Sequence, residues 1–326
     1  MGGRRRLVGM EHPCPNTACK SLRTVKAGFF HRSSDHCSVQ RYRCKDCGTC
    51  FSDATGAPEF LQKKRYLNDD VLYHLASSVS QNRLALLLHT TRKTIAHKLQ
   101  FLGSLCKTHD AALLSGQPPA DSVQFDELET FEHTKCKPIS VALAVEENTR
   151  RILGFEVSQM PATGKLAKTS QQKYGKRKDE RCAGLKRLFQ NISPFCAPKL
   201  SLLSDQCPRY APVVAATLGA EDGRTVTYAQ VKGARGCSTG QGELKKLVHD
   251  PLFSLNHTCA MLRANINRLV RRTWNTTKKI TCLENHLHIY MHYHNTVLQP
   301  QAAERAARRA ERRRALSEMA LALAPA

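Results

Sequence analysis

Two aspartates that follow apolar segments are the chain's strongest candidates for chemistry. Asp126 ends the segment 122–126 (SVQFD), and Asp205 ends the segment 199–205 (KLSLLSD). Two carboxylates at core strand ends suit two-metal phosphoryl transfer, in which the metals lie about 3.5–4 Å apart and stabilise the attacking and leaving oxygens. Mg²⁺ or Mn²⁺ accepts such oxygen ligands, and because Mg²⁺ keeps several waters, two or three side chains suffice. Either aspartate alone could be a strand-end cap, so the prediction depends on the pair.

The pattern around the two aspartates predicts the elements that hold them. Apolar runs bounded by turn signals predict further strands over 138–145, 151–157 and 225–231. Apolar periodicity predicts helices over 181–191, 210–218 and 282–297, and a long helix from 257. Polar or glycine-containing composition predicts flexible loops over 161–180 and 233–242. Strands followed by alternating helices and strands indicate an α/β layered domain with a mixed sheet.

Cysteines near the N-terminus indicate a structural zinc site. Cys14 and Cys19 form one pair, and Cys44 and Cys47 form a second pair that follows an expected strand. Closely spaced thiolates on a tight turn reach one Zn²⁺ at about 2.3 Å, and Gly48 supplies a permissive turn residue. A zinc ribbon of this size folds only with its metal.

Other ligand sets remain open for this site. Cys37, Cys50 and His36 are alternative ligands, and a set of buried free thiols is the competing interpretation. Reduced thiols, and hence metal binding rather than disulfides, are expected because no secretory signal precedes the cysteines.

Residues 68–102 have the pattern of a helix-turn-helix. Short helices are predicted from Asn68 or Asp69, over 81–88 and over 92–102, with a turn at 89–91. The third helix is expected to face inward through Ile95, Leu99 and Leu102 and outward through Arg92, Lys93, His97 and Lys98. A short helix, a tight turn and a basic helix form a reader of the DNA major groove. A plain helical linker fits the same pattern, and the charge of the third helix favours DNA.

The charge of the whole chain indicates a polyanionic partner. Lys and Arg total 50 against 27 Asp and Glu, which gives a net charge of +23. A nucleic-acid backbone is the commonest partner of such a surface, and a ribosomal or nucleoid-packing protein is the simpler alternative. The sequence contains no run of about 18 apolar residues, so it predicts no membrane span. We therefore expect a cytoplasmic, nucleoid-associated protein that binds double-stranded DNA.

Four passages resemble the DDE-type transposases of bacterial insertion sequences, in particular the insertion-sequence-one-like group with an N-terminal zinc ribbon. These passages are 42–51 (YRCKDCGTCF), 125–128 (FDEL), 203–210 (LSDQCPRY) and 255–274 (LNHTCAMLRANINRLVRRTW). The resemblance spans about residues 12–298 and implies a ribonuclease-H-like fold. It also implies donor-strand nicking followed by transfer of the freed 3′-hydroxyl, and at least a dimer on DNA.

The chain departs from that pattern at the third acidic position, where Asn256 replaces the commoner Glu. Asn offers one neutral carbonyl oxygen, which Mg²⁺ accepts only weakly. His257 is a further candidate ligand or proton carrier, or else a surface residue at the start of a helix. Arg263 lies nearly two turns beyond Asn256 on the same helical side and could hold a phosphate. Arg268, Arg271 and Arg272 are expected to line the DNA path.

These features predict a multidomain protein. The expected parts are a zinc ribbon with a basic extension (1–60), a helix-turn-helix (61–110), a ribonuclease-H-like catalytic domain (111–298) and a basic helical tail rich in Ala and Arg (299–326). The predicted function is that of an insertion-sequence transposase with structural Zn²⁺ and catalytic Mg²⁺ or Mn²⁺. The alternatives are an inactive or domesticated transposase that only binds DNA, and a zinc-ribbon transcription factor.

Overall fold

The chain forms two compact units in a computed structural model. The model describes residues 12–33, 36–218, 223–232, 238–239, 246–247, 250–270, 273–305, 307–308 and 311. The first unit ends at Asp69, and the second begins at Asp70. Arg271, Arg272, most of the segment 233–242 and nearly all of the tail beyond residue 308 lie outside the described residues.

The first unit is built on a three-stranded antiparallel sheet. Its strands are β1 (Thr24–Arg32), β2 (Cys37–Cys44) and β3 (Cys50–Ser52), in that spatial order. The predicted strand before the second cysteine pair is part of β2. Tyr42 of β2 stacks on His12 with ring centroids 4.2 Å apart and on Phe51 at 5.5 Å, which gives this small unit an aromatic core.

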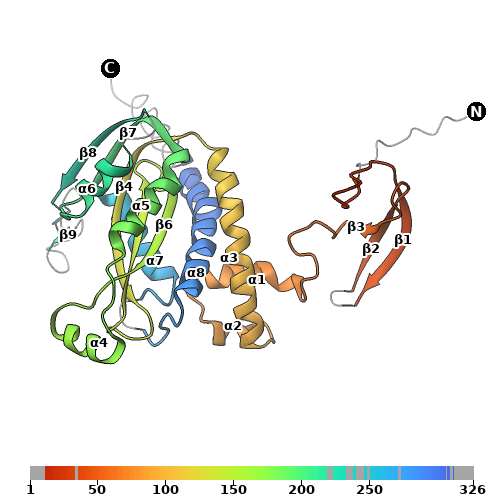
Figure 1. The fold of residues 1–326 in the computed structure, drawn as a ribbon, viewed down its shortest axis with the longest axis horizontal. Helices are drawn as coiled ribbons and strands as arrows, with labels where there is room; N and C mark the ends of the chain where they lie inside the picture. Colours follow the sequence, from red (N-terminus) through yellow and green to blue (C-terminus); the bar gives the residue numbers. More distant parts are fainter. Residues whose placement is uncertain are drawn as a thin grey trace, which may run out of the picture. The chain divides into compact units, whose positions relative to one another are not determined.

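A mixed five-stranded sheet forms the centre of the second unit (Figure 1). Its strands are β4 (Ala120–Phe131), β5 (Pro138–Glu146), β6 (Ile152–Gln159), β7 (Cys196–Asp205) and β8 (Thr225–Val231). In the spatial order β6-β5-β4-β7-β8, the first three strands are antiparallel, whereas β7 and β8 run parallel to β4. The predicted mixed sheet is confirmed. Asp205 ends β7 as expected, but β4 continues beyond Asp126, so that residue lies within its strand.

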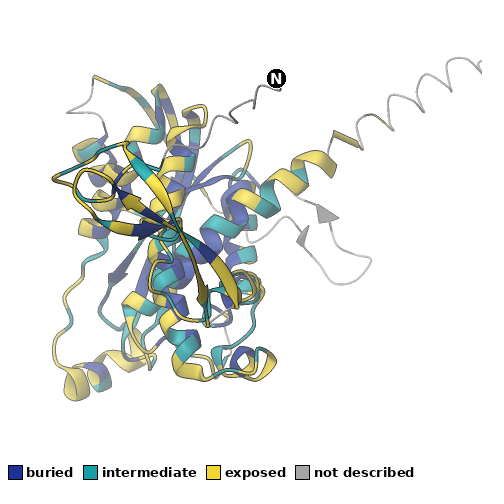
Figure 2. Ribbon diagram, turned by 90° about the vertical axis from the view of Figure 1, so that its right-hand side faces the viewer, coloured by how far each residue is buried: buried dark blue, intermediate teal, exposed yellow. Residues whose placement is uncertain are grey.

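Helices cover both faces of this sheet. The face that carries Phe125 packs on α5 (Arg181–Ile192) and α6 (Tyr210–Thr217), with Phe125 5.0 Å from Phe189 and 5.1 Å from Tyr210 between ring centroids. The opposite face is covered by α7 (Phe253–Asn265) and α8 (Ile280–Tyr293). The described core includes nearly all of β5 and one side of α8, and its buried residues are dark blue in Figure 2. Shorter elements are η1 (Arg65–Leu67), η2 (Gly164–Leu166), η3 (Ser193–Phe195), β9 (Ser238–Thr239), β10 (Lys246–Leu247) and a π-helical turn, His294–Leu298.

Three helices precede the sheet in the second unit, at the positions where the sequence predicted three short helices. They are α1 (Asn68–Leu75), α2 (Gln81–Leu87) and α3 (Arg92–Ser115). Ser80 caps α2 by accepting a hydrogen bond from the Arg83 amide, and Thr91 caps α3 by accepting one from Thr94. The third helix is far longer than the predicted 92–102, because its later turns pack along α8 (Figure 1).

Two sequence-based expectations about this unit are wrong. Lys98 was expected to face outward, but it is 3% exposed. It lies three residues after Ile95 and four before Leu102, so it shares the buried stripe of α3. The segment 161–180 was expected to be an unpatterned loop, but it contains α4 (Ala167–Tyr174). Ser170 is the one buried residue of α4, so the segment has no apolar stripe from which a helix could be predicted.

None of the described helices is long and apolar enough to cross a membrane.

Candidate functional site

The register of the sheet places Asp126 and Asp205 side by side. In the parallel pairing of β4 with β7, Gln124 lies opposite Leu203, and the same register carried two residues further sets Asp126 opposite Asp205. Neighbouring strands are about 4.8 Å apart, and residues two apart on a strand share a face. Both aspartates are half-buried and therefore remain open to a ligand. The two predicted carboxylates thus meet on one face of the sheet.

The negative charge of Asp126 is unfavourable in its surroundings. Burial and the neighbouring Asp205 carboxylate raise the pKa of Asp126 to about 6. Hydrogen bonds oppose this shift, since the Glu127 amide and the Tyr210 hydroxyl donate to Asp126 Oδ1 at 2.7 and 2.9 Å. A divalent cation between the two aspartates would stabilise both charged forms.

A polar network behind β4 holds Tyr210 against Asp126. Glu127, the next residue of β4, accepts hydrogen bonds from Arg209 and from Ser140 Oγ at 3.0 Å. The Tyr210 hydroxyl also lies 3.4 Å from Glu127 Oε2, so one hydroxyl touches both acidic side chains. The sequence analysis did not predict roles for Arg209 and Tyr210. Their place directly after Asp205, at the start of α6, was the available signal.

The helix α7 is fastened to the face that carries the aspartates. The Gln124 side chain donates to the Pro251 carbonyl at 2.9 Å and accepts from the Leu255 amide at 3.1 Å. Further along α7, burial raises the pKa of the Cys259 thiol to about 12, with Asp126 raising it further and Arg263 lowering it. Cys259 therefore lies within electrostatic reach of both Asp126 and Arg263.

Asn256 is held at the start of α7 by a second acid. Its amide nitrogen donates to Asp250 Oδ2 at 2.9 Å, and Asp250 Oδ1 accepts from the Leu252 amide at 3.0 Å. Asp250 is 5% exposed. Asp250 was not among the predicted site residues, but the structure places it in direct contact with Asn256.

Other residues predicted near the site lie elsewhere. His257 is beside Arg150 of the β5–β6 turn, with both ring nitrogens 3.4 Å from the guanidinium, and burial lowers the pKa of His257. The helix α7 ends at Asn265, so Arg268 lies beyond the helix that carries Asn256 and Arg263. Arg92, Lys93 and His97 are exposed on α3, as expected.

The four selected cysteines form a single cluster in the first unit. The sulfurs of Cys14, Cys19, Cys44 and Cys47 all lie within 4.8 Å of one another. The Cys14–Cys47 and Cys19–Cys44 sulfur distances are 3.5 and 3.8 Å. Tetrahedral Zn²⁺ with bonds of about 2.3 Å separates its sulfurs by about 3.8 Å, so the donor set fits zinc.

The turns of this cluster suit thiolate ligands. Gly48 has a φ of 71°, the left-handed conformation expected of it, and hydrogen bonds with Thr49 lower the pKa of Cys47 to about 6. Cys37 and Cys50 are exposed and lie outside the cluster. Within the described ranges there is no second group of three or more such ligands, and His286 and His292 of α8 and His294 after it make separate contacts.

Comparisons with known proteins give weak similarities. No protein-family model and no curated protein matches the sequence. The crystal structure of the catalytic domain of Mos1 mariner transposase is 13% identical with a TM-score of 0.27, and the match covers 62% of this chain and 88% of that chain. The Mos1 mariner paired end complex with Mn is 12% identical with a TM-score of 0.25, covering 73% and 78%. Values this low assign neither fold nor function, so the interpretation depends on the geometry of the site.

Proposed function

We propose that this protein is a DNA transposase with a ribonuclease-H-like catalytic domain that cuts and joins DNA strands with Mg²⁺ or Mn²⁺. The observation that carries the proposal is the placement of Asp126 and Asp205 on neighbouring parallel strands, half-buried and facing the same way. Two adjacent carboxylates, one of which burial makes costly to ionise, are well suited to a divalent cation. The motif resemblance and the net charge of +23 support DNA as the substrate.

The proposed metal ligands are Asp126, Asp205 and Asn256. Because Asp250 engages the amide nitrogen of Asn256, the carbonyl oxygen is the atom left for a metal. Bound metal would supply Lewis-acid stabilisation of the attacking and leaving oxygens. Tyr210 fixes the orientation of Asp126 through its hydroxyl. Arg263, on the same helix as Asn256, is proposed to bind a phosphate of the scissile strand.

The remaining parts are proposed to bind DNA and to bring two element ends together. The four cysteines would hold structural Zn²⁺, and Lys93 and His97 at the start of α3 would contact the major groove. Arg268, Arg271 and Arg272 would line the path of the strand toward the catalytic residues. Joining two ends requires at least two copies of the chain on DNA.

A donor-plasmid assay tests this proposal. The plasmid carries the gene's own flanking DNA with its terminal inverted repeats, and the full chain is added with Mg²⁺ or Mn²⁺. Wild type, Asn256→Glu and Asn256→Ala are compared for strand nicking at the repeats. We expect cleavage by wild type and Asn256→Glu and its loss in Asn256→Ala. Equal activity in all three would place the third ligand elsewhere, and no cleavage by any of them would reject the proposed activity.

The second candidate function is DNA binding without cleavage, as in a decayed or domesticated transposase. The observation in its favour is the neutral amide of Asn256 at the position where the related enzymes carry an acid. One negative charge fewer weakens the binding of a second metal. This function predicts sequence-specific retention of the terminal repeats by wild type and cleavage by neither wild type nor Asn256→Glu.

A further inference from the structure

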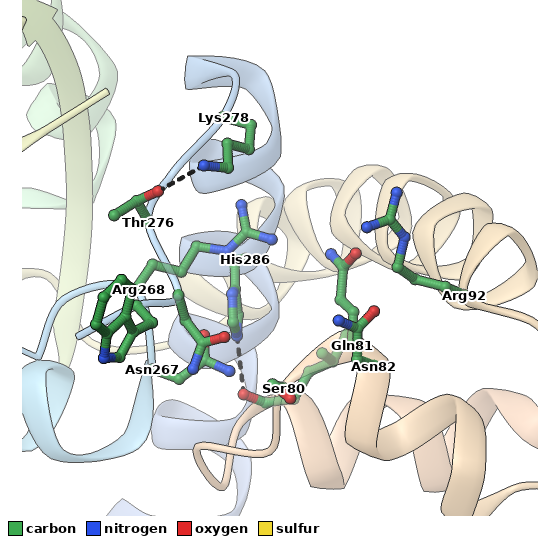
Figure 3. Close-up of a pocket in the computed structure, with 12 residues that line it drawn as sticks. Ser80, Gln81, Asn82, Arg92, Asn267, Arg268, Thr276, Lys278 and His286 are labelled. Carbon is green, nitrogen blue, oxygen red and sulfur yellow. Dashed lines mark hydrogen bonds between the residues drawn. The ribbon is translucent and has the colours of Figure 1, made fainter. Parts of the chain in front are cut away.

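A polar cavity of about 210 Å³ lies in the second unit, apart from the two aspartates (Figure 3). Residues from α1, α2, α3, the segment after α7 and α8 line it. They are Leu75, Ser80, Gln81, Asn82, Arg92, Asn267, Arg268, Trp274, Asn275, Thr276, Lys278 and His286. The helix-turn-helix and the chain that follows α7 therefore share one cavity, to which the proposed catalytic steps assign no ligand.

The charges of the cavity favour an anion. Arg92, Arg268 and Lys278 line it, and no Asp or Glu is among the described lining residues. In Figure 3, Arg92 on the first turn of α3 and Arg268 approach the cavity from opposite sides. Arg268 is close enough to His286 for its positive charge to help lower the pKa of that histidine. Guanidinium groups that converge on one space are suited to a phosphate.

The lining of the cavity also includes a buried histidine, His286. His286 is 1% exposed, and its Nε2 donates to the Leu75 carbonyl at 2.8 Å, so Nδ1 of the neutral ring is an acceptor. Nδ1 is buried and has no hydrogen-bond partner among the described residues. Burial lowers the pKa of His286 to about 3, which keeps Nδ1 unprotonated at neutral pH. His286 therefore contributes a neutral ring to the wall of the cavity.

The rim of the cavity offers an aromatic surface. Trp274 lines the cavity and is fully exposed, at 101% of its reference area, which is unusual for the largest apolar side chain. Exposed aromatic rings beside positive charge are the surfaces on which unpaired bases stack. The amides of Gln81, Asn82 and Asn275 nearby supply both donors and acceptors for a base edge.

We propose that this cavity binds one unpaired nucleotide of a DNA strand, with its phosphate between Arg92 and Arg268 and its base against Trp274. An anionic phosphate and a flat π-surface occur together in a nucleotide. The proposal rests on the DNA-binding function proposed above and adds a site to it. Because Arg268 follows α7 closely, a strand held here leads from the helix-turn-helix toward the helix that carries Asn256.

The single tryptophan of the chain makes the proposal directly measurable, because all tryptophan fluorescence comes from Trp274. The full chain is titrated with a fluorophore-labelled DNA duplex that carries a single-stranded extension, and with a blunt duplex of the same sequence. Anisotropy of the label reports binding, and quenching of Trp274 reports stacking. We expect both duplexes to bind and the extended duplex to quench Trp274 much more strongly at equal occupancy.

Charge-removing variants test the phosphate contacts. Arg268→Gln and Arg92→Gln are each expected to raise the concentration of extended duplex needed for half-maximal quenching about tenfold, since each removes a charged hydrogen bond. Lys186→Gln on α5 removes the same charge from an exposed position outside the cavity and should leave this concentration unchanged. Arg92→Gln, at an exposed side chain, keeps the test valid if Arg268→Gln does not fold.

The outcomes separate the cavity from the proposed function. Binding of both duplexes with no change in Trp274 fluorescence, or equal quenching by the blunt duplex, would overturn the cavity proposal and leave DNA binding intact. Quenching by free dAMP at the same concentrations as the DNA would replace the strand with a free nucleotide as the ligand and overturn the proposal as stated. If neither duplex binds, the result contradicts the proposed DNA-binding function itself.

Discussion

Among single residues, Asp126 and Asp205 matter most, because β4 and β7 bring their like charges together. Burial and the proximity of Asp205 raise the pKa of Asp126 to about 6, and the Tyr210 hydroxyl counteracts that shift. A hydroxyl that donates to a carboxylate stabilises its charged form and limits the orientations of its oxygens. Tyr210 is therefore a positioning residue for the proposed metal ligand Asp126.

Tyr210→Phe removes this hydroxyl and keeps the ring that packs on Phe125. We expect the variant to fold normally and the rate of metal-dependent DNA cleavage to fall about tenfold, because a hydrogen bond to a charged group contributes about 1.5–3 kcal/mol. The Mn²⁺ concentration for half-maximal cleavage should rise. Tyr228→Phe is the matched control, since its hydroxyl bonds Ser204 at 2.7 Å and neither aspartate. Equal losses in both variants would show that Tyr210 has no special role.

The sequence predicted the two aspartates but not the side chains that hold them. Each aspartate follows an apolar run, which is a local signal. The contacts of Glu127 and Asp126 with Tyr210 join residues more than eighty positions apart and depend on β4 lying next to β7. The prediction for Lys98 was wrong for a different reason. Its charge suggested an exposed side chain, but its position lies on the buried stripe of α3.

At the scale of elements, the cysteine cluster predicts that zinc holds the first unit together. Cys44→Ser removes one sulfur of the cluster, and we expect loss of the one zinc bound per chain and unfolding of the three-stranded sheet. Cys37→Ser is the control, since Cys37 is an exposed cysteine of the same strand outside the cluster. Zinc content by atomic absorption and the circular dichroism of the full chain measure the effect. Equal zinc loss in the two variants would mean that the ligand set is different.

The crossing of α3 and α8 gives a prediction about stability. A Cβ added at Gly103 would lie 2.5 Å from Asn285 Cβ and 2.7 Å from its Cα. Gly103→Ala should therefore lower the free energy of unfolding by about 1–3 kcal/mol, in spite of the higher helix propensity of Ala. Gly116→Ala at the end of α3 meets nothing closer than 3.6 Å and should be nearly neutral. Urea unfolding compares the two, and a neutral Gly103→Ala would mean that the helices are not so closely packed.

The elements that the sequence predicted well are those with a clear apolar period. The strand over 225–231 coincides with β8, and the helices over 181–191 and 210–218 differ from α5 and α6 by one residue at one end. The helix α4 was missed because its one buried residue is Ser170, whose hydroxyl donates to the Cys136 carbonyl at 2.6 Å. The length of α3 was missed because its second half is positioned by α8, which is distant in the sequence.

At the scale of the whole molecule, buried neutral histidines predict sensitivity to acid. Burial lowers the pKa of His286 to about 3 and that of His288 to about 4. The unfolded chain protonates these residues near pH 6.5, whereas the folded chain resists, so folding stability falls as the pH decreases below 6.5. For His286 alone the loss between pH 7 and pH 5 is about 2 kcal/mol.

His286→Gln tests this dependence, because the Gln amide keeps a donor for the Leu75 carbonyl and does not titrate. The loss of unfolding free energy between pH 7 and pH 5, measured with urea and circular dichroism, should be smaller in the variant than in wild type. The same loss in both proteins would show that His286 does not cause the acid sensitivity.

Some features of the whole molecule have a local sequence signal, and others do not. The mixed sheet and the cysteine cluster were predicted from local patterns and occur as expected. The cavity shared by Arg92, Arg268 and Trp274 was not predicted, because its lining comes from five separate segments that only the packed helices bring together. Cavities of this kind have no local sequence signal.

A change of metal preference at Asp205 tests most directly whether this aspartate is a ligand of the catalytic metal. In Asp205→Cys a thiolate replaces the carboxylate, and thiolates bind Mg²⁺ poorly but accept softer transition metals. With the donor plasmid described above, we expect Asp205→Cys to lose cleavage in Mg²⁺ by at least about 100-fold and to recover part of it in Mn²⁺. Undiminished cleavage by Asp205→Cys in Mg²⁺ would contradict the assignment of Asp205 as a metal ligand, and with it the account of the site.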